Sequence, residues 1–337
     1  MRTLALFLLL AVFVAVGATD SALAAKTHTL PATANTTFTG FFDNSLPPVL
    51  KIDSGDIVET QSLTLYSDRI KPTTTMAEIV KMRSDLAAEK KTGHTLTGPI
   101  YVNGAEPGDV LEIKILKLVP RPYGVNYFMP GSFKLGTIPE DYPDGYLRIL
   151  SLDLKKMTTQ FAPGIEVPLR PFFGIMAVAP PQDGHVSTAP PNDFGGNMDC
   201  KELGEGATLY LPVFKQGALF VYGDAHAGQG DGEVDLTAIE VAMDKAVFQF
   251  TVRKDMKLTK PFAETATHYI AFGFDPDLNV AAQKALREAI AFLVKQKGLS
   301  PADAYVLSSI ALDMHVTQTV DGNKGVHVMI PKSIFKK

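Results

Sequence analysis

The sequence predicts a mainly β fold, a sandwich or barrel of hairpins, followed by a smaller C-terminal part of α+β type. Short runs with alternating apolar residues recur from Pro31 to about Ile270, and turns rich in glycine and proline separate them. Beyond that point the alternation is replaced by the three- and four-residue spacing of an amphipathic helix. Many strands followed by a helix pair are typical of an α+β chain dominated by β-structure.

Three strand–turn–strand units carry the prediction of hairpins. The segments are "PVLKIDSGDIVETQSLTL" (48–65), "GPIYVNGAEPGDVLEIKILKLVP" (98–120) and "ELGEGATLYLPVFKQGALFVYGDAH" (202–226). The first turns at Ser-Gly-Asp and the second at Glu-Pro-Gly-Asp, both common turn sequences. Their irregular spacing favours a sandwich or barrel over a repeat solenoid. The main exception is "MAEIVKMRSDLAAEKK" (76–91), which we expect to form a polar surface helix or a mobile insertion.

The C-terminal part predicts two helices and a last strand. Residues 279–298 place one apolar face on a helix, and Gly298 suits its end. Ser300 and Pro301 then indicate the start of a second helix that runs to about Ile310. The run "GVHVMI" (325–330) predicts a closing strand. Without a clear linker, we treat 25–337 as one region, β-rich to about 270 and α+β from about 270 to 332. The apolar face consists of Ala282, Leu286, Ala289, Ile290, Leu293 and Val294.

Residues 1–24 have the pattern of a signal peptide. A cationic start precedes the apolar run "TLALFLLLAVFVAVGA" (3–18), and small residues at Ala22 and Ala24 suit a signal peptidase. The run is short for a membrane span, which favours a cleaved signal peptide. The alternative is an uncleaved N-terminal anchor. We therefore expect an exported protein, periplasmic or secreted, with no stable membrane span after cleavage.

Composition limits the partners. The formal net charge is −4, and acidic and basic residues are interspersed, so no basic stripe predicts binding to nucleic acid. Cys200 is the one cysteine and cannot form an intramolecular disulfide. Stability must then come from burial of a core, for which about 313 mature residues suffice.

The loop "VYGDAHAGQGDGEV" (221–234) is the strongest candidate for chemistry. Asp224 and His226 lie two apart and would project from the same face of a strand. A carboxylate beside an imidazole is half of a typical divalent-metal site. The glycines of 228–232 allow a tight turn that returns Glu233 to that face. The alternative is a hairpin whose polar groups only satisfy turn amides.

Two further segments supply polar candidates. In "APPNDFGGNMDCKEL" (189–203), Asn197 and Asp199 would share one face of a strand, with Cys200 on the other. Cys200 is a nucleophile if a base lowers its pKa, although an inert buried thiol is the more common case. His94 precedes a Gly-Pro turn, where it would reach a cleft or lie exposed.

These segments together resemble the acetamidase/formamidase family. The resemblance covers "HTLTGPIYVNGAEPGDVLEI" (94–113), "PPNDFGGNMDCKEL" (190–203), "GDAHAGQGDGEV" (223–234) and two C-terminal segments (298–309 and 316–332). It implies hydrolysis of short amides such as formamide or acetamide, a mainly β fold, and a homo-oligomer, a dimer or a tetramer. It also implies a divalent metal, with zinc expected first and calcium as the alternative. An export signal departs from the family members we compare, which are mostly cytoplasmic.

The resemblance and the residues together suggest a mechanism. A divalent ion held by Asp199, Asp224 and His226 would activate a water, and Glu233 would act as general base and then acid. Asn197 or backbone amides of the glycine loop would stabilise the oxyanion. Two alternatives stay open, a metal-independent amidase that uses Cys200 and a non-catalytic exported ligand-binding relative. The remaining candidates of the substrate-binding loops are His94, Gln229 and Asp231.

Overall fold

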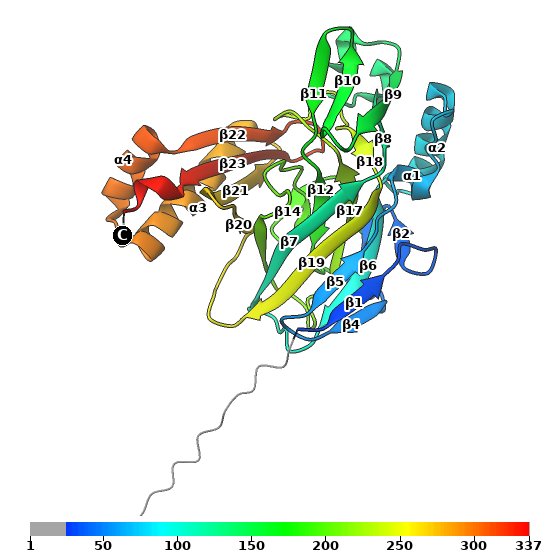
Figure 1. Cartoon of the computed structure of the whole chain (residues 1–337). Helices are drawn as coiled ribbons and strands as arrows, with labels where there is room; N and C mark the ends of the chain where they lie inside the picture. The colour runs from blue at the N-terminus through cyan, green and yellow to red at the C-terminus, as the bar shows by residue number, and fades with distance from the viewer. Residues whose placement is uncertain (1–24, 337) are drawn as a thin grey trace, which may run out of the picture.

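The computed structural model describes residues 25–336 as two large β-sheets packed face to face (Figure 1). This confirms the mainly β fold class. The predicted signal peptide, residues 1–24, lies outside the described residues. Within them, no helix is long and apolar enough to cross a membrane.

The first sheet has nine strands and extends into the C-terminal part of the chain. Most of its pairs are antiparallel, with a long ladder between β7 and β19 at its centre. Its strands are, in spatial order, β1 (Thr27–Leu30), β5 (Ile57–Thr60), β19 (Met243–Arg253), β7 (Val110–Pro120), β16 (Thr208–Pro212), β20 (Phe262–Glu264), β21 (His268–Asp275), β23 (Lys324–Pro331) and β22 (Asp313–Gln318).

The second sheet has twelve strands and carries most of the candidate residues. Strand β6 (Thr95–Val102) pairs with β17 and also with β2 (Thr37–Thr39) and β4 (Leu50–Ile52). Strands β3 (Phe41–Phe42) and β13 (Val186–Ser187) form a separate small pair. The main path of the second sheet is β11 (Ile165–Pro168), β10 (Thr158–Ala162), β9 (Tyr146–Asp153), β8 (Tyr123–Phe128), β18 (Glu240–Val241), β17 (Phe220–His226), β12 (Phe172–Ala177), β15 (Gly195–Asn197) and β14 (Pro191–Asn192).

The three predicted strand–turn–strand units are not hairpins. Strands β4 and β5 belong to different sheets, as do β6 and β7, and β16 and β17. Each predicted turn therefore carries the chain from one layer of the sandwich to the other. Alternating apolar residues bury a strand face equally well in both arrangements, so the pattern predicts the strands without predicting their partners.

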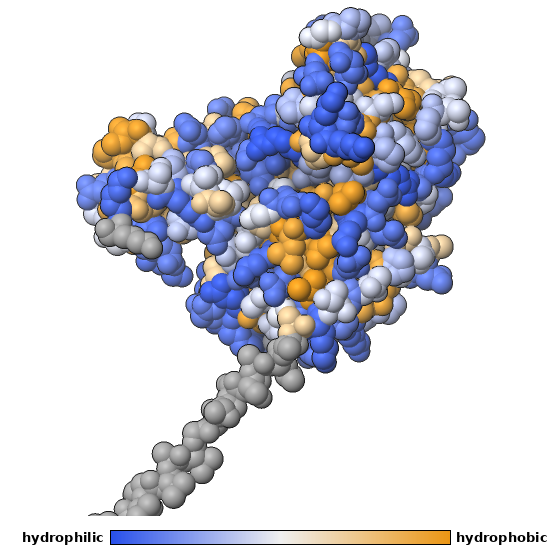
Figure 2. Space-filling view, viewed as in Figure 1, coloured by the Kyte–Doolittle hydropathy of each residue, from blue (hydrophilic) through white to orange (hydrophobic). Residues whose placement is uncertain are grey.

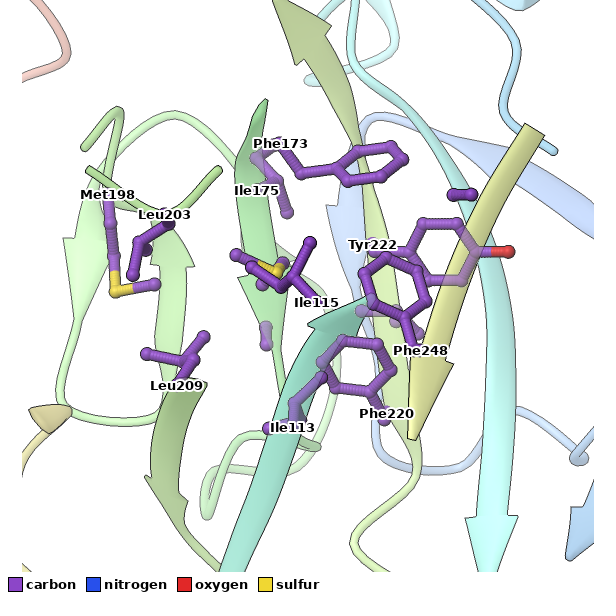
Figure 3. Packing of buried hydrophobic residues seen from close by; sticks show 14 of the residues in the cluster. Ile113, Ile115, Phe173, Ile175, Met198, Leu203, Leu209, Phe220, Tyr222 and Phe248 are labelled. Carbon is purple, nitrogen blue, oxygen red and sulfur yellow. The ribbon is translucent and has the colours of Figure 1, made fainter. Parts of the chain in front are cut away.

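The main core fills the space between the sheets. Aromatic and aliphatic side chains from β7 and β19 on one sheet meet those from β12 and β17 on the other (Figure 3). The rings of Phe173 and Phe248 lie 5.6 Å apart, and both are fully buried. Tyr222 is buried in the same layer, where its hydroxyl hydrogen-bonds Thr60. This packing holds the strands that carry the site in a fixed register.

The C-terminal helices lie together at one side of the molecule with β21, β22 and β23 (Figure 1). Helix α3 (Leu278–Lys297) ends at Gly298 and α4 (Pro301–Ala311) begins after Ser300, whose side chain accepts the Asp303 amide, as predicted. The buried stripe of α3 differs from the predicted face. The helix approaches Gly273 of β21 so closely that a Cβ there would lie 2.2 Å from a backbone oxygen of α3. At so close an approach only small side chains fit, and the stripe is centred on Ala281, Ala285, Ala289 and Leu293.

Two further helices cover the other end of the second sheet. The short α1 (Leu65–Asp68) and α2 (Met76–Ala88) pack on Tyr127 and Met129. Helix α2 confirms the predicted polar helix and begins with a capping box formed by Thr75 and Glu78. The remaining elements are the 3-10 turns η1 (Gly131–Phe133), η2 (Pro139–Asp141) and η3 (Lys332–Ile334).

Candidate active site

The predicted site residues gather at one end of the second sheet, beside a cavity of about 570 Å³. Strand β17 supplies Asp224 and His226, and the loop after it supplies Glu233. Asp199 follows directly after β15, which pairs with β12. The structure therefore brings together residues that lie more than thirty positions apart in the sequence. Polar residues that line the cavity include His94, Asn197, Asp224, Glu233, Glu240 and Asp321.

His226 is the centre of the cluster and is fully buried. Its Nε2 lies 3.5 Å from Asp224 Oδ2, 3.2 Å from Glu240 Oε1 and 4.0 Å from Glu233 Oε1. Burial alone would lower the pKa of His226, but the carboxylates of Glu240 and Asp224 raise it well above its usual value. One imidazole nitrogen thus faces three carboxylates.

Gln229 fixes which nitrogen of His226 carries a proton. The Gln229 side-chain amide donates to the backbone oxygen of Asp199 at 2.7 Å, so its own oxygen must face His226 Nδ1, 3.1 Å away. An oxygen accepts, and Nδ1 is therefore the donor. Nε2 faces the carboxylates and is the nitrogen that would give up its proton to a bound cation, the arrangement usual for a histidine that ligates a metal.

Asp199 and Glu233 are buried carboxylates without hydrogen-bond partners. Asp199 is 1% exposed and neither of its carboxylate oxygens has a partner, and the same holds for Oε2 of Glu233. Burial raises the pKa of both groups well above the usual range, and neighbouring carboxylates add to the effect. An isolated buried carboxylate is very unfavourable, so these oxygens require a cation or a proton.

Gly174 of β12 makes room for the cluster. A Cβ at this position would lie 2.5 Å from Asp199 Oδ1 and 2.9 Å from both Asp224 Oδ2 and His226 Cε1. The absence of a side chain at Gly174 is therefore a steric requirement of the site.

Three of the acidic residues have left-handed backbone conformations. The φ angles are 50° at Asp199, 54° at Asp224 and 44° at Glu233. Residues other than glycine seldom adopt such angles, and strained backbone of this kind clusters at functional sites. The adjacent Gly232 supplies the turn that returns Glu233 to the cavity, as predicted, with a φ of 103°.

Asn197 and His94 lie at the cavity wall. The Asn197 amide nitrogen donates to the backbone oxygen of Ala189 and to Asp321 Oδ2, each at 3.1 Å, while its buried Oδ1 has no partner. His94 Nδ1 lies 3.1 Å from the Thr188 hydroxyl, and burial lowers the pKa of His94 despite the opposing charge of Asp224.

Two residues singled out from the sequence lie elsewhere. Asp231 is exposed on the far side of its loop, where it pairs with Lys201 and with His315 Nδ1 at 2.9 Å. Cys200 points into the core between the sheets and is fully buried, and burial raises the pKa of its thiol. Neither side chain belongs to the ligand groups around His226, and the position of Cys200 in the hydrophobic core removes the geometric support for a Cys200 nucleophile.

Sequence reasoning missed Glu240 and Asp321. Glu240 on β18 stands directly opposite His226 in the strand register, and its Oε1 accepts the Ala238 amide at 3.0 Å. A glutamate within the apolar run "AIEVAM" (238–243) was the available signal. Asp321 comes from the turn between β22 and β23, and only the folded chain brings it to Asn197.

Comparison with known proteins identifies the family. The model of the acetamidase/formamidase family matches residues 28–183 and 183–337. The chain belongs to this family. The acetamidase of Mycolicibacterium smegmatis is 29% identical over 206 residues, which span 44% of this chain and about half (51%) of that protein. The formamidase of Methylophilus methylotrophus is 24% identical over 72% of this chain and 77% of its own length.

Solved structures agree with the acetamidase/formamidase assignment. The crystal structure of an acetamidase from Bacillus halodurans has a TM-score of 0.82 and 29% identity, covering 91% of this chain and 98% of that one. Family membership supports an amidase, a hydrolase of amide bonds.

The donor groups of this acetamidase/formamidase-family chain fit a divalent cation. One ligand atom each from Asp199, His226 and Glu233 lies within 4.8 Å of the others, and all three residues are buried. A second triad of Asp224, His226 and Glu240 meets the same criterion. The first triad holds the buried oxygens without partners, whereas Glu240 already accepts a backbone amide. The unsatisfied atoms thus favour Asp199, His226 and Glu233 as ligands.

Proposed function

We propose that this chain hydrolyses the C–N bond of short linear amides, such as formamide and acetamide, to a carboxylate and ammonia, with the help of a divalent ion. Zinc is the first expectation, because it binds histidine nitrogen as well as carboxylate oxygen, and calcium, which takes oxygen ligands, is the alternative. The observation that carries the proposal is the convergence of unsatisfied Asp199, His226 and Glu233 atoms, of which Glu233 also lines the cavity.

Asp199, His226 Nε2 and Glu233 would hold the ion. When bound, it would polarise the amide carbonyl and lower the pKa of a water. This assignment revises the sequence-based roles, in which Asp224 was a ligand and Glu233 the base. The Gln229 contact to His226 Nδ1 would keep the ring oriented, as outer hydrogen bonds do in metal sites.

Glu240 is then the better candidate for general base. It faces the cavity, and its Oε1 is held by the Ala238 amide 3.2 Å from His226 Nε2. Glu240 would take a proton from the attacking water as the oxygen bonds to the amide carbon. The same proton would pass to the leaving nitrogen as the C–N bond breaks, which releases ammonia.

Asn197 would orient the substrate. Its amide nitrogen is committed to Ala189 and Asp321, so its free Oδ1 would accept an N–H of the substrate amide. This role replaces the expected stabilisation of an oxyanion by the Asn197 amide group. His94 lines the same cavity with only its Nδ1 engaged by Thr188, and we assign its Nε2 as the donor to the substrate carbonyl.

A matched pair of substitutions tests these roles. Glu233→Gln should lose the bound metal together with ammonia release, whereas Glu240→Gln should retain the metal and lose about 10²-fold or more of turnover. Both variants would be measured by metal analysis and by ammonia release from formamide, acetamide and propionamide, before and after chelation. Full activity after complete metal removal would refute the metal mechanism. Ammonia release from none of the three amides would refute the short-amide assignment and favour a ligand-binding relative.

We also propose export and self-association. Export rests on residues 1–24, and N-terminal sequencing of the protein recovered outside the cytoplasm would test cleavage after Ala24. A homo-oligomer is supported by exposed apolar side chains on α4 and on the edge strand β22. Figure 2 shows an apolar patch at the position of α4. Ile310 of α4 is 75% exposed. Ile310→Glu should shift the mass measured by light scattering toward a monomer. The other exposed members of this surface are Tyr305, Val306, Met314 and Val316.

A further inference from the structure

The cavity is much larger than formamide or acetamide requires. Its volume of about 570 Å³ lies within the range of roughly 300–1,000 Å³ typical of sites for larger ligands. One water takes about 30 Å³ of liquid, and formamide has only three non-hydrogen atoms. A substrate that fills this space must extend well beyond its amide group.

The lining of the cavity combines two kinds of chemistry. One part is the acidic groups that surround His226. The rest is mostly apolar and includes Leu65, Tyr66, Leu135, Leu236 and Val320. A single arginine, Arg83, belongs to this lining.

Arg83 has no carboxylate partner among residues 25–336. On the outer face of the same helix, α2, the neighbouring cation Lys81 pairs with Asp85 at 2.9 Å, one turn further along. Arg83 is instead half-buried and lines the cavity. Removing a guanidinium from water without a partner is unfavourable, so a ligand that carries a negative charge would be stabilised there.

Two tyrosines, Tyr66 and Tyr127, line the same cavity as Arg83. The hydroxyls of Tyr66 and Tyr127, buried under α2, lie 3.1 Å apart. Burial raises the pKa of both tyrosines, and the positive charge of Arg83 is close enough to oppose that effect. A planar guanidinium in this position can bind a carboxylate through two parallel hydrogen bonds.

We propose that Arg83 anchors a carboxylate of the substrate, so that the preferred substrates are amides with an anionic group at the far end of the acyl chain. This inference rests on the proposed amidase function. The carboxylates around His226 repel an anion and Arg83 attracts it, so this pattern of charge orients the substrate with its amide toward His226. Simple ω-amic acids such as succinamate have this chemistry.

The test compares succinamate with its neutral isostere, succinamide. The readout is the ratio of kcat/KM for succinamate to that for succinamide, from initial rates of ammonia release, because a general loss of activity cancels in a ratio. The unmodified protein should prefer succinamate, and Arg83→Gln should reduce the ratio about 10- to 100-fold, mainly through KM, as expected for loss of a charged hydrogen bond. Arg83→Lys, which keeps the charge but not the paired geometry, should give an intermediate ratio.

Lys81→Gln is the matched control, since it removes one positive charge from the exposed face of the same helix. It should leave the ratio unchanged, and a fall equal to that of Arg83→Gln would overturn the inference in favour of a general surface field. A wild-type ratio near or below one, or a ratio that Arg83→Gln leaves unchanged, would also overturn it. In those cases ammonia release from acetamide would show that the amidase function still stands, whereas its absence would mark failure of the proposed function itself.

Discussion

Replacement of Gly174 by alanine should abolish metal binding while leaving the fold intact. The added Cβ would lie 2.5 Å from Asp199 Oδ1, whereas ordinary van der Waals contact begins at 3.4 Å. The oxygen must therefore move by about 0.9 Å, well beyond the tolerance of roughly 0.2 Å in a metal–ligand distance. A misplacement of about 1 Å typically costs 10²-fold in rate.

The stability cost of Gly174→Ala should be modest. Overpacking of a core by one carbon costs about 1–3 kcal/mol, and the φ angle of Gly174 lies outside the left-handed region, so alanine meets no backbone strain. We expect a loss of at least about 10²-fold in kcat/KM and of most bound metal. The melting temperature should fall by only a few degrees.

Gly228→Ala is the matched control for Gly174→Ala. Gly228 is also buried and lies just beyond β17, but a Cβ there would meet no atom closer than 3.6 Å. Metal content, ammonia release and thermal unfolding would be measured for both variants. A folded Gly174→Ala protein with normal metal content and turnover would refute the placement of the metal against β12.

Three further predictions follow from contacts in the structure. Gln229→Leu should weaken metal binding about 10- to 100-fold, measured by competition with a chelating dye, because His226 Nδ1 loses its acceptor; unchanged affinity would contradict that role. Native Cys200 should resist alkylation at pH 8 and react fully in denaturant, since it is buried with a raised pKa, and fast native labelling with loss of activity would revive it as nucleophile. Asp56→Asn should reduce stability by about 1–3 kcal/mol at pH 7. Burial raises the pKa of Asp56, but hydrogen bonds from Lys26, His28 and Asp53 outweigh it and lower the pKa. The stability that Asp56 contributes is therefore present above about pH 4 and is lost as the pH falls. An equal difference in unfolding free energy between the two proteins at pH 3, measured by chemical denaturation, would contradict this.

Local sequence patterns were sufficient for the strands and helices but not for their partners. Capping residues such as Thr75 and Ser300 act within one helical turn, and both helices begin where these residues indicate. The pairing of β6 with β17 rather than β7 depends on contacts between residues far apart in the chain. Alternating apolar residues do not encode that choice.

The same distinction applies to the site. Asp224, His226 and Glu233 come from one continuous segment, strand β17 and the loop after it, and the glycines of that loop predict their convergence. Glu240 joins them through the register of β17 with β18, which no single-strand pattern specifies. Asp231 lies in the same glycine-rich acidic segment as Glu233, yet its side chain falls on the outer side of the turn, where it pairs with Lys201.

The loop that carries Glu233 is held by the C-terminal part of the chain. Gly232 donates its amide to the Thr317 carbonyl at 3.1 Å and accepts the Thr319 amide at 2.9 Å, at the end of β22. A ligand of the proposed metal is thus positioned by residues more than eighty places later in the sequence. During synthesis or the proposed export, the sandwich strands up to β19 emerge well before these contacts exist, so capture of the proposed metal would be among the last steps of maturation. Chains that terminate early would carry the family's motifs and still lack a working centre.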